Sequence, residues 1–154
     1  MIGNIKIIAV CMCKVYDERN YRIIRALNNF AVENDYRLFV YHTCSDLYWK
    51  TLSEKGEQSV FDLIDYNITD AVVTFEEGVY AENVMTKIRM DAAKYGKPVI
   101  SVGVEHDDCI SIKFGYAKGF EQVVRHVIEQ HGVRDIGFIA GRKDEENSEE
   151  RIAV

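Results

Sequence analysis

The sequence predicts an α/β fold: a doubly wound parallel sheet flanked by helices, with its strands in the flavodoxin-like order. Two observations lead to this prediction. Short apolar segments rich in β-branched residues alternate with segments of helical periodicity, and several of the apolar segments are apolar nearly throughout. Strands that are covered by helices on both faces have this composition. Right-handed crossovers then place the loops that carry function at the carboxyl ends of the strands.

Six segments have the pattern of strands. They are residues 5–10, 37–42, 71–75, 98–104, 109–114 and 135–140. Helical patterns lie between most of them, around residues 23–31, 60–64 and 84–92. The clearest helical pattern places apolar side chains at i, i+3, i+4, i+7 and i+8, which are Phe120, Val123, Val124, Val127 and Ile128. Gly132 follows this pattern and predicts the end of a helix.

Composition argues against several classes of function. The formal net charge is −6, and a nucleic-acid-binding face requires the opposite sign, so we expect no nucleic acid to bind this segment. No apolar run approaches the roughly 20 residues of a membrane helix, and the first residues do not form a secretion signal. Four cysteines without a dense framework are typical of a reducing compartment. We therefore expect a cytoplasmic protein that makes no membrane contact.

Motifs of the common α/β enzymes are absent from the sequence. The loop expected after the first strand, from Cys11 to Tyr16, contains no glycine and therefore lacks the G-x-G-x-x-G of dinucleotide-binding folds. There is no P-loop and no G-x-S-x-G nucleophile elbow. The residues after the first and third predicted strands do not supply the acidic cluster of a phosphoacceptor receiver domain. We expect neither a cofactor nor catalysis in this segment.

A group of cysteine and histidine residues offers one alternative. Cys11 and Cys13 follow the first predicted strand, whereas His42 and Cys44 lie at the end of the second. Four soft ligands at the ends of adjacent strands suit a tetrahedral zinc ion. The other interpretation is that the cysteines are small buried hydrophobic residues. The C-x-C spacing, tighter than that of the usual structural zinc sites, favours this second interpretation.

Side chains suited to a small polar ligand lie in the predicted strand-end loops. Tyr16 follows the first strand, and Arg19 and Asn20 lie near the start of the first helix, where backbone N–H groups favour polar ligands. Capping by Asp17, with Asn20 at the third helical position, is the simpler interpretation, and it is compatible with a ligand contact by Asn20. Glu76 follows the third strand, where it either accepts hydrogen bonds from ligand hydroxyls or lies in a solvated turn.

Aromatic residues accompany these polar side chains. Tyr48, Trp49 and Tyr80 also lie in or near the loops after strands. Aromatic rings beside polar groups suit flat polar ligands such as sugars, purines or amino acids. Loop packing or a dimer contact explains such residues as well, and packing is the favoured interpretation of Trp49.

The order and spacing of several segments resemble the effector-binding domains of lactose-repressor-type regulators and of ribose-type periplasmic binding proteins. The family patterns gyxlxl, dgxi and kpvvxi are matched by residues 35–40, 70–73 and 97–102. The stretch gxxxaxxhLixxGhrxIxxixG is similar to a set of residues in the last third of the chain: Gly119, Val123, His126, Val127, Ile128, Gly132, Arg134, Ile136 and Gly141. The sxxR pattern that comes next corresponds to residues 148–151. The similarity runs over nearly the whole chain.

This resemblance implies a ligand that is bound between two lobes of a periplasmic-binding-protein-like fold. Residues 1–133 would be the N-terminal lobe, and residues 134–154 the first strand and loop of a truncated second lobe. The family positions that contact ligand correspond to the entrance of the first helix and to the sxxR arginine, which here are Arg19, Asn20, Tyr21 and Arg151. In place of the usual Asp-Asn after the fifth strand the chain has Gly115 and Tyr116, so we expect a changed ligand set.

The resemblance also implies a role in bacterial signalling or transcription regulation through ligand-driven lobe closure. No helix-turn-helix precedes Ile5, so the chain is most similar to sensor lobes that are fused to cytoplasmic output modules such as diguanylate cyclases (GGDEF). We expect a homodimer in which the strand from Asp135 to Ala140 is disordered or exchanged, and low ligand affinity for this segment alone. The alternative from another class is a stand-alone flavodoxin-like enzyme or binding protein that uses only these loops.

Overall fold

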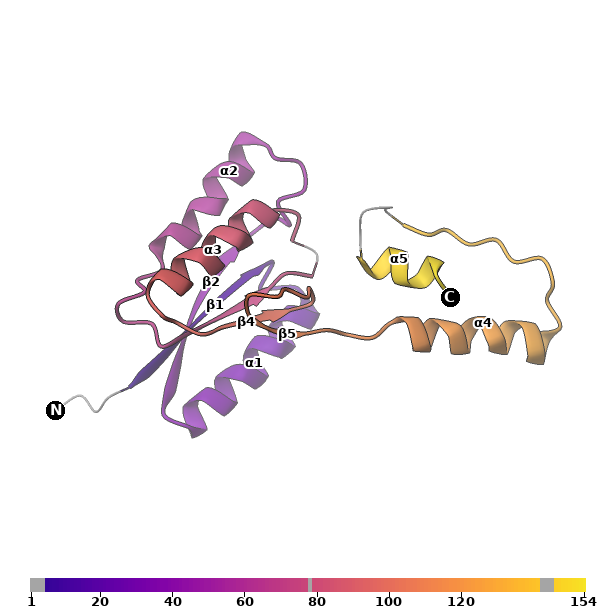
Figure 1. Ribbon diagram of the computed structural model, residues 1–154, viewed down its shortest axis with the longest axis horizontal. Coiled ribbons are helices and arrows are strands. Elements are labelled where there is room, and N and C mark those ends of the chain that lie inside the picture. Colours follow the sequence, from indigo (N-terminus) through magenta and orange to yellow (C-terminus); the bar gives the residue numbers. More distant parts are fainter. Residues whose placement is uncertain (1–4, 78, 142–145) are drawn as a thin grey trace. The chain divides into compact units, whose positions relative to one another are not determined.

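The computed structural model describes residues 5–77, 79–141 and 146–154, and it confirms the predicted parallel α/β fold (Figure 1). The chain separates into two compact units, Met1–Ile112 and Lys113–Val154. The first unit contains the sheet. The first helix after the sheet belongs to the second unit.

One parallel sheet of five strands forms the first unit, in the order β2-β1-β3-β4-β5. The strands are β1 (Lys6–Cys13), β2 (Tyr36–Thr43), β3 (Ala71–Phe75), β4 (Val99–Val102) and β5 (Ile110–Ile112). This is the flavodoxin-like order that the sequence predicts. Strand β1 extends through Cys13, so Cys11 and Cys13 lie in the strand and not in the loop after it.

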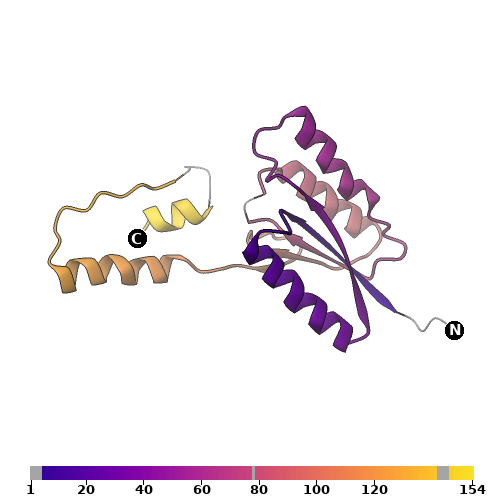
Figure 2. The same ribbon diagram turned by 180° about the vertical axis from the view of Figure 1, so that it is seen from behind.

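Helices cover both faces of the sheet. They are α1 (Glu18–Glu33), α2 (Leu52–Gln58), the 3₁₀ helix η1 (Ser59–Leu63) and α3 (Glu82–Lys94). Figures 1 and 2 show α1 on one face and α2 with α3 on the other. The apolar pattern around residues 60–64 predicted an α-helix, but in the structure it forms the tighter 3₁₀ turn that follows α2.

The principal core lies between the sheet and the helices α2, η1 and α3. Ala9, Cys11 and Cys13 of β1 contribute to it because alternate residues of a strand point to the same face. Phe61 of η1 and Met85 of α3 pack against them from the helical side. Each of these five residues is buried, and burial of this apolar area is the main stabilising contribution to the unit.

The starts of the helices differ from the prediction in one respect. Asp17 occupies the N-cap position of α1, but its side chain makes no capping hydrogen bond. The capping box occurs instead at α2, where Thr51 Oγ1 accepts from the backbone N–H of Glu54 and the Glu54 carboxylate accepts from the backbone N–H of Thr51.

The second unit contains α4 (Ala117–His131) and α5 (Glu146–Ile152). Helix α4 matches the clearest helical pattern of the sequence, and it ends at Gly132, which has the left-handed backbone conformation. The rings of Phe120 and Phe138 lie 5.1 Å apart in this unit. Residues 132–141 have neither helix nor strand, so the predicted strand from Asp135 to Ala140 is not formed. A strand requires a neighbour, and the described residues provide none for this segment.

The helices of the described residues carry no candidate membrane span. None combines the length and the apolar character that crossing a bilayer demands.

Candidate ligand-binding site

The carboxyl ends of the strands of the first unit lie together at one edge of the sheet, as parallel pairing requires. The backbone N–H of Lys14 donates to the carbonyl of Thr43 at 2.8 Å, which joins the loops after β1 and β2. The N–H of Glu76 donates to the carbonyl of Val102 at 2.9 Å, which joins the ends of β3 and β4. This is the edge at which open parallel sheets bind ligands.

Polar side chains connect the loops at this edge. The hydroxyl of Tyr16 donates to the carbonyl of Cys44 at 2.6 Å, and the residue as a whole remains 59% exposed. Arg19, from the first turn of α1, forms an ion pair with Glu77 after β3, at 2.5 Å between Nη2 and Oε2. The loops after β1, β2 and β3 are therefore tied together at their rims, while Tyr16 still faces solvent.

Asn20 has a supporting position. Its side-chain nitrogen donates to the carbonyls of Cys13 and Lys14, at 3.0 and 3.1 Å. These bonds hold the end of β1 against the start of α1. Tyr21, the next residue along the helix, is 55% exposed. Of the four side chains that the sequence predicted near the start of the first helix, Tyr16, Arg19 and Tyr21 face outward and Asn20 binds the backbone.

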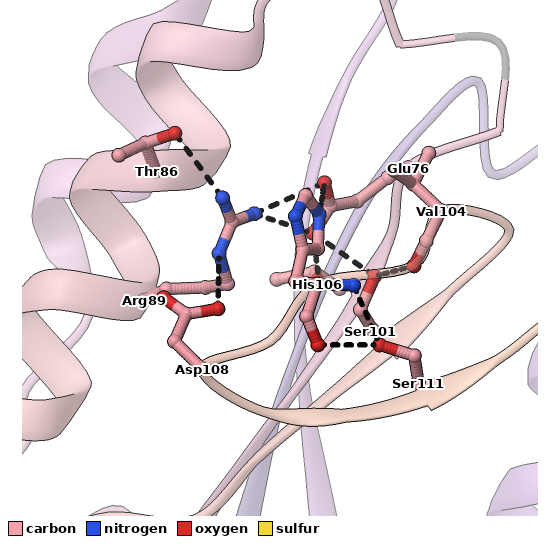
Figure 3. A network of polar contacts seen from close by, with 9 residues as sticks. Glu76, Thr86, Arg89, Ser101, Val104, His106, Asp108 and Ser111 are labelled. Carbon is pink, nitrogen blue, oxygen red and sulfur yellow. Dashed lines mark hydrogen bonds and ion pairs between the residues drawn. The ribbon is translucent and has the colours of Figure 1, made fainter. Parts of the chain in front are cut away.

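The buried carboxylate of Glu76 is the centre of a polar network at the end of β3 (Figure 3). Glu76 is 6% exposed, and Arg89 of α3 is 7% exposed. Nη1 of Arg89 lies 3.0 Å from Oε1 and 3.1 Å from Oε2 of Glu76. The hydroxyls of Thr74 and Ser101 donate to Oε1, at 2.7 and 3.2 Å. The solvated-turn interpretation of Glu76 is therefore wrong, because the carboxylate is buried and its charge is compensated by Arg89.

The connection between β4 and β5 joins this network through His106 (Figure 3). Nε2 of His106 lies 2.9 Å from Oε2 of Glu76, and the backbone N–H of His106 donates to Ser111 Oγ at 3.0 Å. Asp108 lies 3.5 Å from Nε of Arg89, an ion pair without a hydrogen bond. That Nε is a buried donor with no hydrogen-bond partner among the described residues. The network fixes the turn that precedes β5.

Sequence reasoning misses Arg89 and His106. Arg89 carries a signal, since it lies on the buried face of α3 beside Met85, Ile88 and Ala92, and a charge on such a face requires a buried partner. His106 carries no comparable signal. It comes from a short acidic turn whose residues all suit solvent.

The predicted zinc alternative does not match the geometry. Cys11 and Cys13 lie in the core under α2 and α3. In the register of β1 and β2, His42 pairs with Met12, so it points to the opposite face from the two cysteines. Cys44 is exposed beyond the end of β2. Among residues 5–77, 79–141 and 146–154, no group of three or more His, Cys, Asp or Glu side chains is placed to hold a metal ion.

Burial also makes these thiols poor ligands. Desolvation raises the pKa of Cys11, and the nearby carboxylate of Glu76 adds to this effect. Desolvation raises the pKa of the Cys13 thiol to about 11, although the hydrogen bond from Thr43 acts in the opposite direction. Both thiols therefore stay protonated in the core, and a metal ion would have to enter the packed region under α2 and α3 to displace their protons.

Arg151 belongs to the second unit. Its Nη2 lies 3.4 Å from the Oγ of Ser148, one helical turn earlier, so the two ends of the sxxR pattern contact each other within α5. Ser148 is fully buried.

A groove of about 330 Å³ lies away from the strand ends, between η1 and α3. Its charged side chains neutralise one another, since Nζ of Lys87 lies 2.7 Å from a carboxylate oxygen of Asp62 and 3.5 Å from one of Asp91. The groove has no connection with the predicted ligand residues, and we do not assign it a ligand.

No protein-family model and no curated protein sequence matches the chain. Solved structures do match it. One is the Lac repressor dimer bound to operator and the anti-inducer ONPF, with a TM-score of 0.65 and 13% identity, covering 96% of this chain and 42% of that one. A Lac repressor bound to ONPG in the repressed state gives a TM-score of 0.61 and 15% identity. This match covers 97% of this chain and 42% of the repressor chain.

An ABC-transporter solute-binding protein from Burkholderia multivorans, with an unknown ligand represented as α-D-erythrofuranose, is similar as well. Its TM-score is 0.65 and its sequence identity is 13%. The match covers 96% of this chain and 54% of the solute-binding protein. The chain therefore has the fold of Lac-repressor-type and periplasmic-binding-protein-type lobes, as the resemblance in the sequence implied. It spans about half the length of these proteins.

Proposed function

We propose that this chain, which has a lobe fold of the Lac-repressor and solute-binding type, is a ligand-sensing segment of a bacterial signalling or regulatory protein. A small polar ligand, such as a sugar, a purine or an amino acid, binds at the carboxyl ends of β1, β2 and β3. The observation that carries this proposal is the exposed pair Tyr16 and Arg19, which contact the loops after β2 and β3 at the sheet edge where parallel α/β folds bind ligands.

The ligand residues have different roles in this proposal. Arg19 supplies a guanidinium that exchanges part of its contact with Glu77 for a carboxylate or hydroxyl of the ligand. Tyr16 and Tyr21 are exposed aromatic residues, although the Tyr16 hydroxyl donates to the Cys44 carbonyl. Asn20 and Glu76 act indirectly, because their polar atoms are bonded within the protein and hold the loops in place. Arg151 is included because of its place in the sxxR pattern, since its guanidinium also suits a carboxylate or hydroxyl.

Regulation follows from ligand contact with both lobes, which biases open and closed states. We propose a cytoplasmic homodimer in which this change is transmitted to an output domain outside the chain, such as a diguanylate cyclase or a DNA-binding module. The chain itself has no catalytic role in this proposal. In the dimer, the segment from Asp135 to Ala140 pairs with a strand of the partner or of a complete second lobe.

A ligand screen followed by NMR tests the sensing proposal. Sugars, nucleosides and amino acids are each added at millimolar concentration to the labelled chain, and backbone amide shifts are mapped. We expect shifts in the strand-end loops, with about tenfold weaker binding in Arg19→Ala, since an ionic hydrogen bond is lost. Arg22→Ala is the matched control, because Arg22 lies on the same helix and pairs with Glu18. Shifts confined to the groove between η1 and α3, or none, contradict the proposal.

A further inference from the structure

The loop between β2 and α2 presents the most exposed aromatic residue at the ligand edge. Trp49 is 76% exposed, and it is the one tryptophan of the sequence. Its ring meets that of Tyr48 edge-on, with 4.6 Å between the ring centroids. Tyr48 in turn meets Tyr80, from the loop after β3, at 5.1 Å and 84°. Two strand-end loops thus build one aromatic surface at whose rim the indole faces solvent.

The backbone on either side of this pair is strained. Leu47 has a φ of 62° and Lys50 a φ of 55°, and neither is glycine. Such conformations disfavour side chains with a Cβ and persist where the surroundings impose them. Leu47 is fully buried in the core, so it anchors the loop from below. The strain turns Tyr48 and Trp49 outward while the residue before them stays inside.

Two glutamates hold the same loop. Oε2 of Glu57 accepts from the backbone N–H groups of Cys44 and Ser45, at 2.8 and 2.9 Å. The buried Glu54 accepts from the N–H of Trp49 at 3.2 Å and from that of Thr51 at 2.9 Å. None of these bonds uses the indole, whose contact within the loop is the edge-on packing against the Tyr48 ring. The backbone of the loop is therefore held by the two glutamates, and most of the Trp49 side chain is left exposed.

The loop is also part of the candidate ligand site. Its Cys44 carbonyl accepts from Tyr16, and its Asp46 carboxylate forms an ion pair with Lys14 at 3.0 Å. The carbonyl of Asp46 accepts from the N–H of Tyr80. The loop that carries the indole therefore also carries one partner of a charged pair, Lys14 and Asp46.

We propose that Tyr48 and Trp49 form a preorganised stacking platform for a cyclic polar ligand, one face of whose ring lies on the Trp49 indole. This inference rests on the proposed function and narrows its ligand class. A pyranose and a purine nucleoside share the necessary chemistry, which is a flat ring face with hydrogen-bonding groups at its edge. A rigid platform favours such rings because little conformational entropy is lost on binding. Acyclic ligands gain nothing from it.

The single tryptophan makes the test specific. Emission of Trp49 is recorded while methyl β-D-glucopyranoside, adenosine or the acyclic sorbitol is added to the whole chain. We expect a saturable change in intensity and a blue shift with one of the two cyclic probes, which identifies the class, and none with sorbitol. In Trp49→Ala, NMR shifts should show about tenfold weaker binding of that probe. Trp49→Phe should retain most of the affinity.

Leu52→Ala is the matched control, because Leu52 is 87% exposed three residues beyond Trp49 and is not part of the aromatic surface. It should bind the cyclic probe as the unaltered chain does. If a cyclic probe shifts the strand-end loops while Trp49 emission and the affinity of Trp49→Ala stay unchanged, the platform is refuted and the sensing proposal stands. The platform is also refuted if only amino acids bind, or if emission depends on protein concentration without ligand. If no compound binds, both proposals fail.

Discussion

Arg89 donates to both carboxylate oxygens of Glu76, at 3.0 and 3.1 Å, and both side chains are buried. The contact joins the first turn after β3 to the middle of α3. Removing either charge from water is costly, and the remaining lone pairs of Glu76 must be satisfied for the pair to be tolerated. Ser101 and His106 meet part of this requirement from β4 and from the turn before β5. The pair is thus the point at which four elements are fixed together.

Replacement of Arg89 by methionine should lower the free energy of unfolding by about 3 to 5 kcal/mol, since it leaves the Glu76 carboxylate buried without a cation. Urea unfolding of the chain measures this loss. Lys87→Met is the control on the same helix, because Lys87 pairs with Asp62 at the surface and an exposed pair contributes below about 1 kcal/mol. The double variant Glu76→Gln with Arg89→Met should recover part of the loss. Equal losses for Arg89→Met and Lys87→Met would contradict the buried-pair argument.

The fold was predictable because its signal is local and repeated. Each of the five sheet strands lies in a short, largely apolar run, and the parallel order of β1 to β4 follows from the helices between them. What the sequence concealed depends on contacts between distant segments. The apolar pattern at 60–64 became a 3₁₀ helix under the packing of Phe61. Residues 135–140 have a strand composition and form no strand, as expected for a segment without a neighbouring strand among the described residues.

The site was predictable only in outline. The order of the elements places Tyr16 and Arg19 at the carboxyl edge of the sheet, and sequence position alone predicts this location. The roles of Asn20 and Glu76 were hidden, because each depends on partners 6 or more residues away that no local pattern marks. The strained pair Leu47 and Lys50 was hidden too, since leucine and lysine are not residue types that mark a positive φ in a sequence.

The four cysteines should react with iodoacetamide in a defined order at about pH 8. Cys44 is exposed and should be labelled first. Burial raises the pKa of Cys109, which is partly accessible, so it should follow more slowly. Cys11 and Cys13 should stay unlabelled until the chain unfolds, because their thiols are buried and protonated. Mass spectrometry after timed quenching measures the order. Labelling of Cys13 at the rate of Cys44 would show that the end of β1 is open to solvent.

Stability should fall in alkaline solution. The pKa of Cys13 is raised from its ordinary 9.0 to about 11, so this thiol favours the folded state below pH 9 and loses that contribution as the pH rises to 11. The loss amounts to roughly 2 to 3 kcal/mol. Urea unfolding at several pH values measures it. Cys13→Ala should be less stable near pH 7 but should lose less between pH 9 and 11. Part of the slope should remain, because burial also raises the pKa values of Cys11 and Tyr66. An unchanged slope in Cys13→Ala would contradict the assignment.

Gly103, at the end of β4, should tolerate no side chain. Its φ is 104°, and a Cβ there would lie 2.6 Å from the Cβ and 2.8 Å from the backbone nitrogen of Glu77. Since backbone must shift to admit the methyl group, Gly103→Ala should cost about 2 to 4 kcal/mol in unfolding free energy. Gly96→Ala is the matched control: its φ is also positive, at 63°, but nothing lies within 4 Å of the added Cβ. Its cost should be about 1 kcal/mol, from the left-handed backbone alone. The difference between the two variants measures the close approach of the β3 and β4 loops. Equal costs for the two variants would mean that Glu77 moves aside freely. In that case the ion pair between Arg19 and Glu77 should be altered in Gly103→Ala, which NMR chemical shifts would detect.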